Sequence, residues 1–206
     1  MKQTTKTILI SVGATLVVIA TVWLALWWLS PMRWMFNGLR DDAGFEDFGP
    51  MGRGMMNEMH GMVDVDSEYA YMSSMIPHHE EAVENARILH DRTNREEMRE
   101  FAQSIIEVQT REIEQMEVWL ARWYPDRPAR ADYDPMMRDY GGLHGDELDR
   151  AFLQDMIPHH MAAVMMSQEF LTRGLAEHDE VADLARDIRD AQLREIRQMS
   201  NWLRGY

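Results

Sequence analysis

The sequence predicts an all-α protein: an antiparallel four-helix bundle made of two helical hairpins and preceded by one N-terminal transmembrane helix. Three observations support this class. An uncharged apolar stretch lies near the amino terminus, and apolar residues recur every three or four positions from Asp66 onward. The helical region also consists of two similar halves, 66–123 and 146–203. Because one helical hairpin cannot bury its apolar face alone, the two halves are expected to pack together within residues 66–206.

Residues 1–30 are expected to form a membrane anchor. The stretch 8–29 carries no charge, and as a helix it would be about 33 Å long, which matches a hydrocarbon core of about 30 Å. Lys2 and Lys6 precede it and favour a single-pass arrangement in the cell membrane, with the body periplasmic or extracellular. A cleaved signal peptide is the alternative, but its apolar core is usually shorter, and LWWLSPMRW is a poor cleavage site.

Residues 31–65 are expected to form a tether between the anchor and the bundle. Glycine is frequent there and apolar periodicity is absent. The segment also holds seven methionines, which is unusual for a disordered spacer. It is therefore either a flexible spacer or a segment that collects a soft metal. Its candidate metal ligands are Met55, Met56, Met59, His60 and Met62.

Capping residues and breaks in the apolar pattern delimit four helices beyond the tether. Segment 124–145, with three prolines and three glycines, separates the two hairpins. The expected helices run from Asp66 or Ser67 to about His90, from Asn94 to Trp123, from a cap at Asp146 to near Gly174, and from Asp179 to about Leu203.

One short motif, MIPHH, occurs at 75–79 and again at 156–160, and it contains four of the eight histidines of the chain. Pro77 and Pro158 fall within the first helix of each hairpin. Proline inside a helix removes a backbone hydrogen bond, so a kink is expected beside each histidine pair. The alternative is that each proline begins a shorter helix.

The repeated motif predicts a set of metal ligands in each hairpin. Each histidine pair lies on or beside the apolar stripe of its helix, one turn after a methionine. A glutamate occupies the apolar stripe of each partner helix, where it is costly unless paired, and it could hold one imidazole N–H while the other nitrogen binds a metal. The candidate ligands are Met75, His78, His79, Met156, His159 and His160, and the supporting residues are Glu112, Glu195, Gln109 and Gln192.

Copper is the expected metal. The chain has no cysteine, and thioether with imidazole suits Cu(I), whereas zinc prefers cysteine, histidine and carboxylate. Cu(II) is an alternative through imidazole and carboxylate. A di-iron bundle would need Glu-x-x-His on facing helices, which is missing. A purely structural role also stays open, with histidines hydrogen-bonded in the core and the glutamates paired to Arg111 or Arg194.

Composition and motifs limit the function classes. The net charge of −14 disfavours nucleic-acid binding, which needs clustered lysine and arginine. No nucleophile triad, phosphate loop or cofactor fingerprint is present, so the protein is not expected to be an enzyme. The expected partners are a metal ion, the membrane through the N-terminal helix and a copper-handling protein. Two alternatives are a metal oxidase and a structural module whose histidines sense pH.

The repeated MIPHH and the later pattern Q-x-x-E-I-x-x-M, followed by a WL ending, resemble the domain of unknown function family 305 over residues 66–206. The resemblance implies a ferritin-like bundle, a location outside the cytoplasm, and copper binding through methionine and histidine. It adds Met166 to the candidate ligands, whereas Asn85 departs from the pattern in the first repeat. The function expected is that of a membrane-anchored extracytoplasmic copper-binding protein for copper sequestration, tolerance or transfer.

Overall fold

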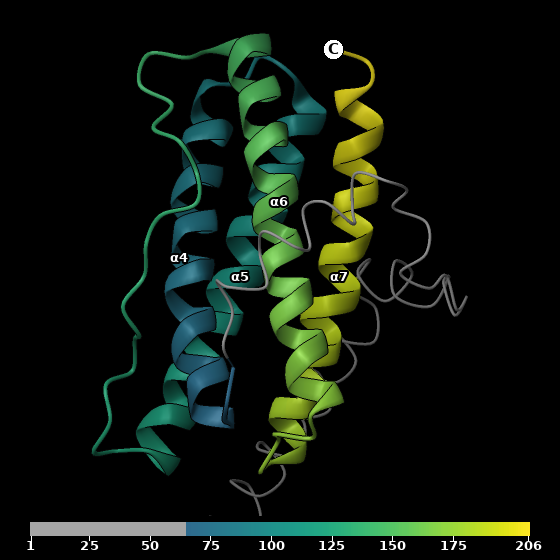
Figure 1. The fold of residues 1–206 in the computed structure, drawn as a ribbon. Helices are drawn as coiled ribbons and strands as arrows, with labels where there is room; N and C mark the ends of the chain where they lie inside the picture. Colours follow the sequence, from purple (N-terminus) through teal and green to yellow (C-terminus); the bar gives the residue numbers. More distant parts are fainter. Residues whose placement is uncertain (1–64) are drawn as a thin grey trace, which may run out of the picture. The chain divides into compact units, whose positions relative to one another are not determined.

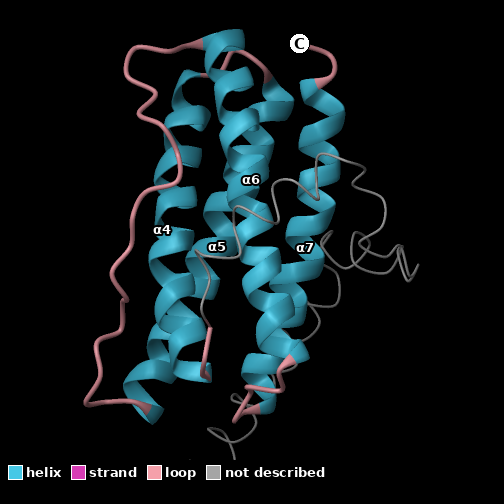
Figure 2. Cartoon of the chain, viewed as in Figure 1, coloured by secondary structure: helices cyan, strands magenta, loops and turns pink. Residues whose placement is uncertain are grey.

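A computed structural model of the chain describes residues 65–206, and these residues are helical, with no strand among them (Figure 1, Figure 2). The all-α prediction is therefore confirmed for this part of the chain. No helix among the described residues is long and apolar enough to cross a bilayer. The expected anchor at 1–30 and the tether ligands Met55, Met56, Met59, His60 and Met62 lie outside the described residues.

The four helices are close to those expected from the sequence, with differences at their starts. They are α4 (Glu68–Arg92), α5 (Glu96–Trp123), α6 (Gly145–Thr172) and α7 (Asp179–Leu203). Ser67 caps α4 as predicted, by accepting a hydrogen bond from the Ala70 N–H. Asp146 is not the cap of α6. His144 holds that position without a side-chain bond, because the positive φ of Gly145 lets the chain turn into the helix two residues earlier.

The helices form a bundle of two antiparallel hairpins that meet through their first helices. Helix α4 packs on α5, α6 packs on α7, and α4 packs on α6 (Figure 1). The register of α4 against α6 is fixed by Tyr71, whose hydroxyl hydrogen-bonds that of Ser167, and by His78, which contacts His159. As residue numbers rise along α4 they fall along α6, so these two helices are antiparallel.

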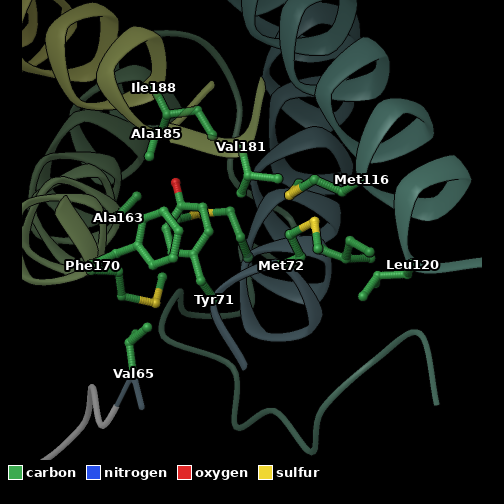
Figure 3. Close-up of a cluster of buried hydrophobic side chains, with 13 residues drawn as sticks. Val65, Tyr71, Met72, Met116, Leu120, Ala163, Phe170, Val181, Ala185 and Ile188 are labelled. Atoms are coloured by element: carbon green, nitrogen blue, oxygen red, sulfur yellow. The ribbon is translucent and has the colours of Figure 1, made fainter. Parts of the chain in front are cut away.

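A large cluster of apolar side chains fills one end of the bundle (Figure 3). The rings of Tyr71 and Phe170 stack there at 4.4 Å between centroids, among methionine and aliphatic side chains from all four helices. Val65 belongs to this cluster and is only 2% exposed. Val65 therefore packs into the helical body, one residue before the start at residue 66 that the sequence predicts. Burial of its apolar side chain favours this position.

Pro77 and Pro158 lie inside α4 and α6, so the alternative that each begins a helix is wrong, while the kink stays a prediction. Proline has no N–H, so it leaves the carbonyl four residues earlier without its helical donor. In α4 this is the carbonyl of Ser73, and it accepts a hydrogen bond of 2.9 Å from the Ala131 N–H. Pro77 thus creates an attachment point for the segment that joins the two hairpins.

That joining segment, 124–144, runs along the outside of α4 for the whole length of the helix (Figure 1). Near the start of α4, the Tyr69 hydroxyl donates to the Pro128 carbonyl, and near its end Arg92 donates to the Gly141 carbonyl. Between them, Arg130 forms ion pairs with Glu80 of α4 and Glu117 of α5. We call residues 124–144 the strap. It returns the chain to the other end of the bundle so that α6 can run antiparallel to α4.

Two buried carboxylates, at equivalent places in the repeat, join each first helix to the opposite hairpin. Glu68 in α4 and Asp149 in α6 are both 0% exposed. Glu68 accepts hydrogen bonds from the backbone N–H and Nδ1 of His178, which directly precedes α7. Asp149 lies 3.8 Å from the guanidinium of Arg95, which directly precedes α5. A negative charge beside the start of a helix is favourable, so both contacts hold the hairpins together.

Replacing Glu68 with alanine is expected to lower the free energy of unfolding by about 2 to 4 kcal/mol, because it leaves buried donors unpaired. Glu68→Gln should cost less, since an amide oxygen still accepts. The measurement is urea unfolding followed by helical circular dichroism. The control is Glu97→Ala, an exposed glutamate in the first turn of α5, which should change little. Equal effects at the two positions would contradict the structural role of Glu68.

Candidate metal centre

The two MIPHH motifs come together where α4 and α6 cross, near the middle of both helices. His78, His79, His159 and His160 are at most 2% exposed, and we call these four residues the histidine layer. The rings of His78 and His159 lie face to face across the two helices, 3.8 Å apart between centroids and tilted by 31°. The sequence predicted a histidine pair in each hairpin but not this contact, which makes one shared centre.

Each hairpin supplies a glutamate to its own outer histidine. In the first, Nε2 of His79 lies 2.9 Å from the carboxylate of Glu112, and in the second, Nε2 of His160 lies 2.6 Å from that of Glu195. A glutamate that holds a histidine within each hairpin is the arrangement that the stripe positions predict. The histidines are the partners that the structure gives to these carboxylates.

These contacts determine which imidazole nitrogens keep a lone pair. A carboxylate or carbonyl oxygen can only accept, so Nε2 of His79 and of His160 carries the proton. The same holds for His78, whose Nε2 donates to the backbone carbonyl of His159 at 3.0 Å. In the neutral form of each ring, Nδ1 is then the nitrogen that carries the lone pair. None of these Nδ1 atoms has a hydrogen-bond partner in the protein, although all are buried.

His159 differs from the other three histidines, because neither of its ring nitrogens has a hydrogen bond. Its Nε2 lies 3.1 Å from a carboxylate oxygen of Glu81 but without hydrogen-bond geometry. Glu81 also binds the strap: it accepts from the Tyr133 hydroxyl and from the backbone N–H groups of Met136 and Met137. Sequence reasoning missed Glu81.

A signal for Glu81 was present in the repeat itself. The second copy of the motif reads MIPHHMAAV and carries Ala162 where the first carries Glu81. A carboxylate in one copy only, three residues after a histidine on the same helix face, breaks the internal symmetry. Tyr133, which lies in the strap, had no such signal.

Burial keeps the two central histidines neutral. It lowers the pKa of His78 well below the usual value, and neighbouring His159 lowers it further. Burial also lowers the pKa of His159 to about 4, although Glu81 opposes that shift. For Glu81, burial alone would raise the pKa, but contacts from His159, Tyr133 and the Met137 N–H outweigh it and hold the pKa at about 2. Near neutral pH His78 and His159 are therefore uncharged and Glu81 is ionised.

The predicted methionine ligands flank the histidine layer, but they do not all lie together. Met75 and Met156, one turn before each histidine pair, are both 0% exposed. Met166 was grouped with Met156, yet ten helical residues place them about 15 Å apart along α6. Met166 instead belongs to the apolar cluster that contains Met75 and Met116 (Figure 3 shows Met116). One ion therefore cannot bind both Met156 and Met166.

Gln109 and Gln192 occupy equivalent positions on α5 and α7. Both are 3% exposed, and the side-chain oxygen of each has no hydrogen-bond partner in the protein. An unpaired buried carbonyl is costly, so these two oxygens resemble the imidazole nitrogens in being buried acceptors without a donor. Nothing in the described residues shows a direct contact between the glutamines and the histidines, so their supporting role stays a prediction.

The donor set fits a soft ion better than a hard one. Within residues 65–206, no three or more histidine, aspartate or glutamate side chains are grouped so that they could hold a metal. The histidine layer instead offers unprotonated imidazole nitrogens with buried thioethers before and after them along the helices. Cu(I) accepts these two ligand types together.

The fold and motif agree with known structures. The structure of CopM in its Cu(I)-bound form is 32% identical, with a TM-score of 0.60, covering 68% of this chain and 96% of that chain. The Cu(II)-bound form of CopM has a TM-score of 0.58 at the same identity and covers 98% of that chain. A DUF305 protein from Streptomyces coelicolor is 29% identical, with a TM-score of 0.60, over 69% of this chain and 95% of that chain. No curated protein matches.

The family model described as "Domain of unknown function (DUF305)" matches residues 68–203, which include all four helices and both MIPHH motifs. This match covers more than half of the sequence and spans the whole described bundle apart from its ends. The chain belongs to the DUF305 family.

Proposed function

We propose that this protein binds copper, as Cu(I), at the histidine layer. The observation that carries the proposal is the set of buried Nδ1 atoms of His78, His79 and His160, whose lone pairs have no donor in the protein. Leaving a buried acceptor unpaired costs about 1 to 3 kcal/mol each. A bound ion offsets that cost, and it can do so without displacing the contacts at Nε2.

The relatives support this choice of metal. The CopM structures include forms with Cu(I), Cu(II) and silver, and silver is a soft ion like Cu(I). In this chain Met75 and Met156 would supply thioether sulfur, while Glu112 and Glu195 would orient two imidazoles without binding the ion themselves. Cu(II) is the second choice, because the buried thioethers favour the softer state.

Replacing His78 or His159 with alanine should weaken Cu(I) binding by more than about 100-fold, beyond the ~10- to 100-fold typical for a residue that only orients a ligand. The two losses should be similar, because both rings belong to one centre. Competition between the protein and a chromogenic Cu(I) chelator at fixed pH measures the affinity. His144→Ala, at an exposed position before α6, is the control and should bind normally. Unchanged affinity after replacement of all four layer histidines would refute the proposal.

The pKa shifts argue against a pH-sensing role near neutrality and lead to a prediction for the metal-free protein. An unfolded histidine binds a proton near pH 6.5, whereas His159 in the folded state does so near pH 4. Between these values the unfolded state binds more protons, so the free energy of unfolding should fall as pH drops from 6.5 to 4. The slope is up to about 1.4 kcal/mol per pH unit for each such histidine.

Urea unfolding at successive pH values tests this expectation. The double variant His78→Gln with His159→Gln should show a shallower slope over the same range, because glutamine does not titrate. Glu81, with its pKa of about 2, adds a further loss of stability only below pH 4.5. Stability that increases from pH 6.5 to pH 5 would show that these histidines are charged in the folded protein.

We also propose that the protein acts outside the cytoplasm as a single-pass membrane protein that sequesters copper, confers copper tolerance or passes copper on. The support is the uncharged stretch 8–29 with Lys2 and Lys6 before it. A di-iron metal oxidase would need Glu-x-x-His on facing helices, and the sequence has no such spacing. We therefore favour binding and transfer over catalysis.

Protease added to intact spheroplasts should digest the helical body if the anchor lies in the membrane with its amino terminus inside. The digestion is followed with an antibody against the carboxyl terminus, and a cytoplasmic protein serves as the control that stays intact. Full protection of the body would contradict the orientation. A mature form that begins near Ser30 would show instead that the apolar stretch is a cleaved signal.

A further inference from the structure

A pocket of about 440 Å³ lies between α4 and the strap, directly beside the histidine layer. Pro77 and Glu81 of α4 line it on one side, and Tyr133, Met137 and Tyr140 of the strap line it on the other. Glu81 lines this pocket and lies 3.1 Å from Nε2 of His159, and Tyr133, also in the lining, packs edge-on against the ring of His78. The histidines themselves are sealed from solvent, so an ion needs a route to them.

The pocket offers groups that suit a soft cation on its way inward. Its outer part carries the carboxylates of Glu84 and Asp139. The side chain of Met137, only 8% exposed, adds a thioether beside Glu81, to which its backbone N–H donates at 2.9 Å. The Tyr140 hydroxyl is buried without a hydrogen-bond partner in the protein. An unpaired buried hydroxyl in the lining, together with carboxylates and a thioether, indicates a polar or ionic occupant.

From this geometry we infer that the pocket is the portal through which copper reaches and leaves the histidine layer, and that Glu81 closes its inner end. This inference rests on the proposed copper-binding function. His159 is the receiving ligand, because it alone among the four histidines has both ring nitrogens without a hydrogen bond. Glu81 is held in the closed position by Tyr133 and by two backbone N–H groups of the strap.

The second repeat differs from the first at this position, and the difference is in the sequence. Ala162 stands there in place of Glu81, and it is 4% exposed among packed side chains. Among residues 65–206 the strap covers α4 only, because one long connection joins the hairpins. The portal therefore lies on the α4 side of the shared centre, even though the ligands come from both hairpins.

The absence of cysteine allows a direct test by plugging the pocket. Glu84 is exposed and lines the pocket, so Glu84→Cys in the full-length protein can be modified with a bulky maleimide. Glu147→Cys is the matched control: it removes the same charge at an exposed position on α6 and receives the same reagent. The readout is the rate at which a Cu(I) chelator removes copper from the loaded protein, measured beside the equilibrium affinity.

The modified Glu84→Cys protein should release copper about tenfold more slowly than the modified control, with an unchanged affinity. Equal release rates, in a protein that binds Cu(I) normally, would overturn the portal while leaving the proposed function intact. A protein that binds no Cu(I) at all, wild type included, would instead overturn the proposed function. The two failures are therefore distinguishable.

A second variant tests whether Glu81 closes the inner end of the pocket. Glu81→Ala, which introduces the residue found in the second repeat, should speed copper release several-fold, because the inner end of the pocket is then open. Arg130→Gln is the control, since it weakens attachment of the same strap to Glu80 and Glu117 without touching Glu81. If Arg130→Gln speeds release as much as Glu81→Ala does, closure belongs to the strap as a whole and not to Glu81.

Discussion

The burial of four imidazoles where α4 crosses α6 is the constraint on which the rest of this structure depends. Histidine carries two nitrogens that need partners, and in a protein interior each unpaired nitrogen is costly. The bundle satisfies one nitrogen in three of the rings, with Glu112, Glu195 and a backbone carbonyl. These contacts lower the cost of burying the rings. The remaining nitrogens have no hydrogen-bond partner in the protein and are therefore available to bind an ion.

The internal repeat explains why the centre forms where equivalent residues of the two hairpins, His78 and His159, meet. Two copies of one hairpin pack through the same face, so the same motif meets itself at their contact. The equivalent pairs His79 with Glu112 and His160 with Glu195 follow from this symmetry. The symmetry is broken at Glu81, and this break coincides with the strap. Among residues 65–206 one long connection joins the two hairpins, and it lies along α4, so the pocket beside the strap forms on that face.

Proline in the repeated motif has a structural consequence that differs between the two copies. Pro77 releases the Ser73 carbonyl, which the strap uses as a point of attachment. In α6, Pro158 releases the carbonyl of Gln154, a residue on an exposed face of the bundle. The carbonyl that proline leaves without its helical donor thus binds the strap beside the histidine layer in the first repeat. In the second repeat the equivalent carbonyl belongs to an exposed residue. In the first repeat, Pro77 of the motif thus both fixes the strap and lines the pocket beneath it.

The sequence alone determined the all-α class, the two hairpins, the four core histidines and the pairing of Glu112 and Glu195 with two of them. These follow from local periodicity and repetition, which are properties of neighbouring residues. Only the tertiary structure decided that His78 and His159 share one centre, that Met166 lies away from Met156, and that Glu81 of α4 contacts both the strap and His159. These three features depend on the register of one helix against another and on the path of the irregular strap. Side-chain packing between distant segments determines the register and the path, and the periodicity of the sequence carries no information about either.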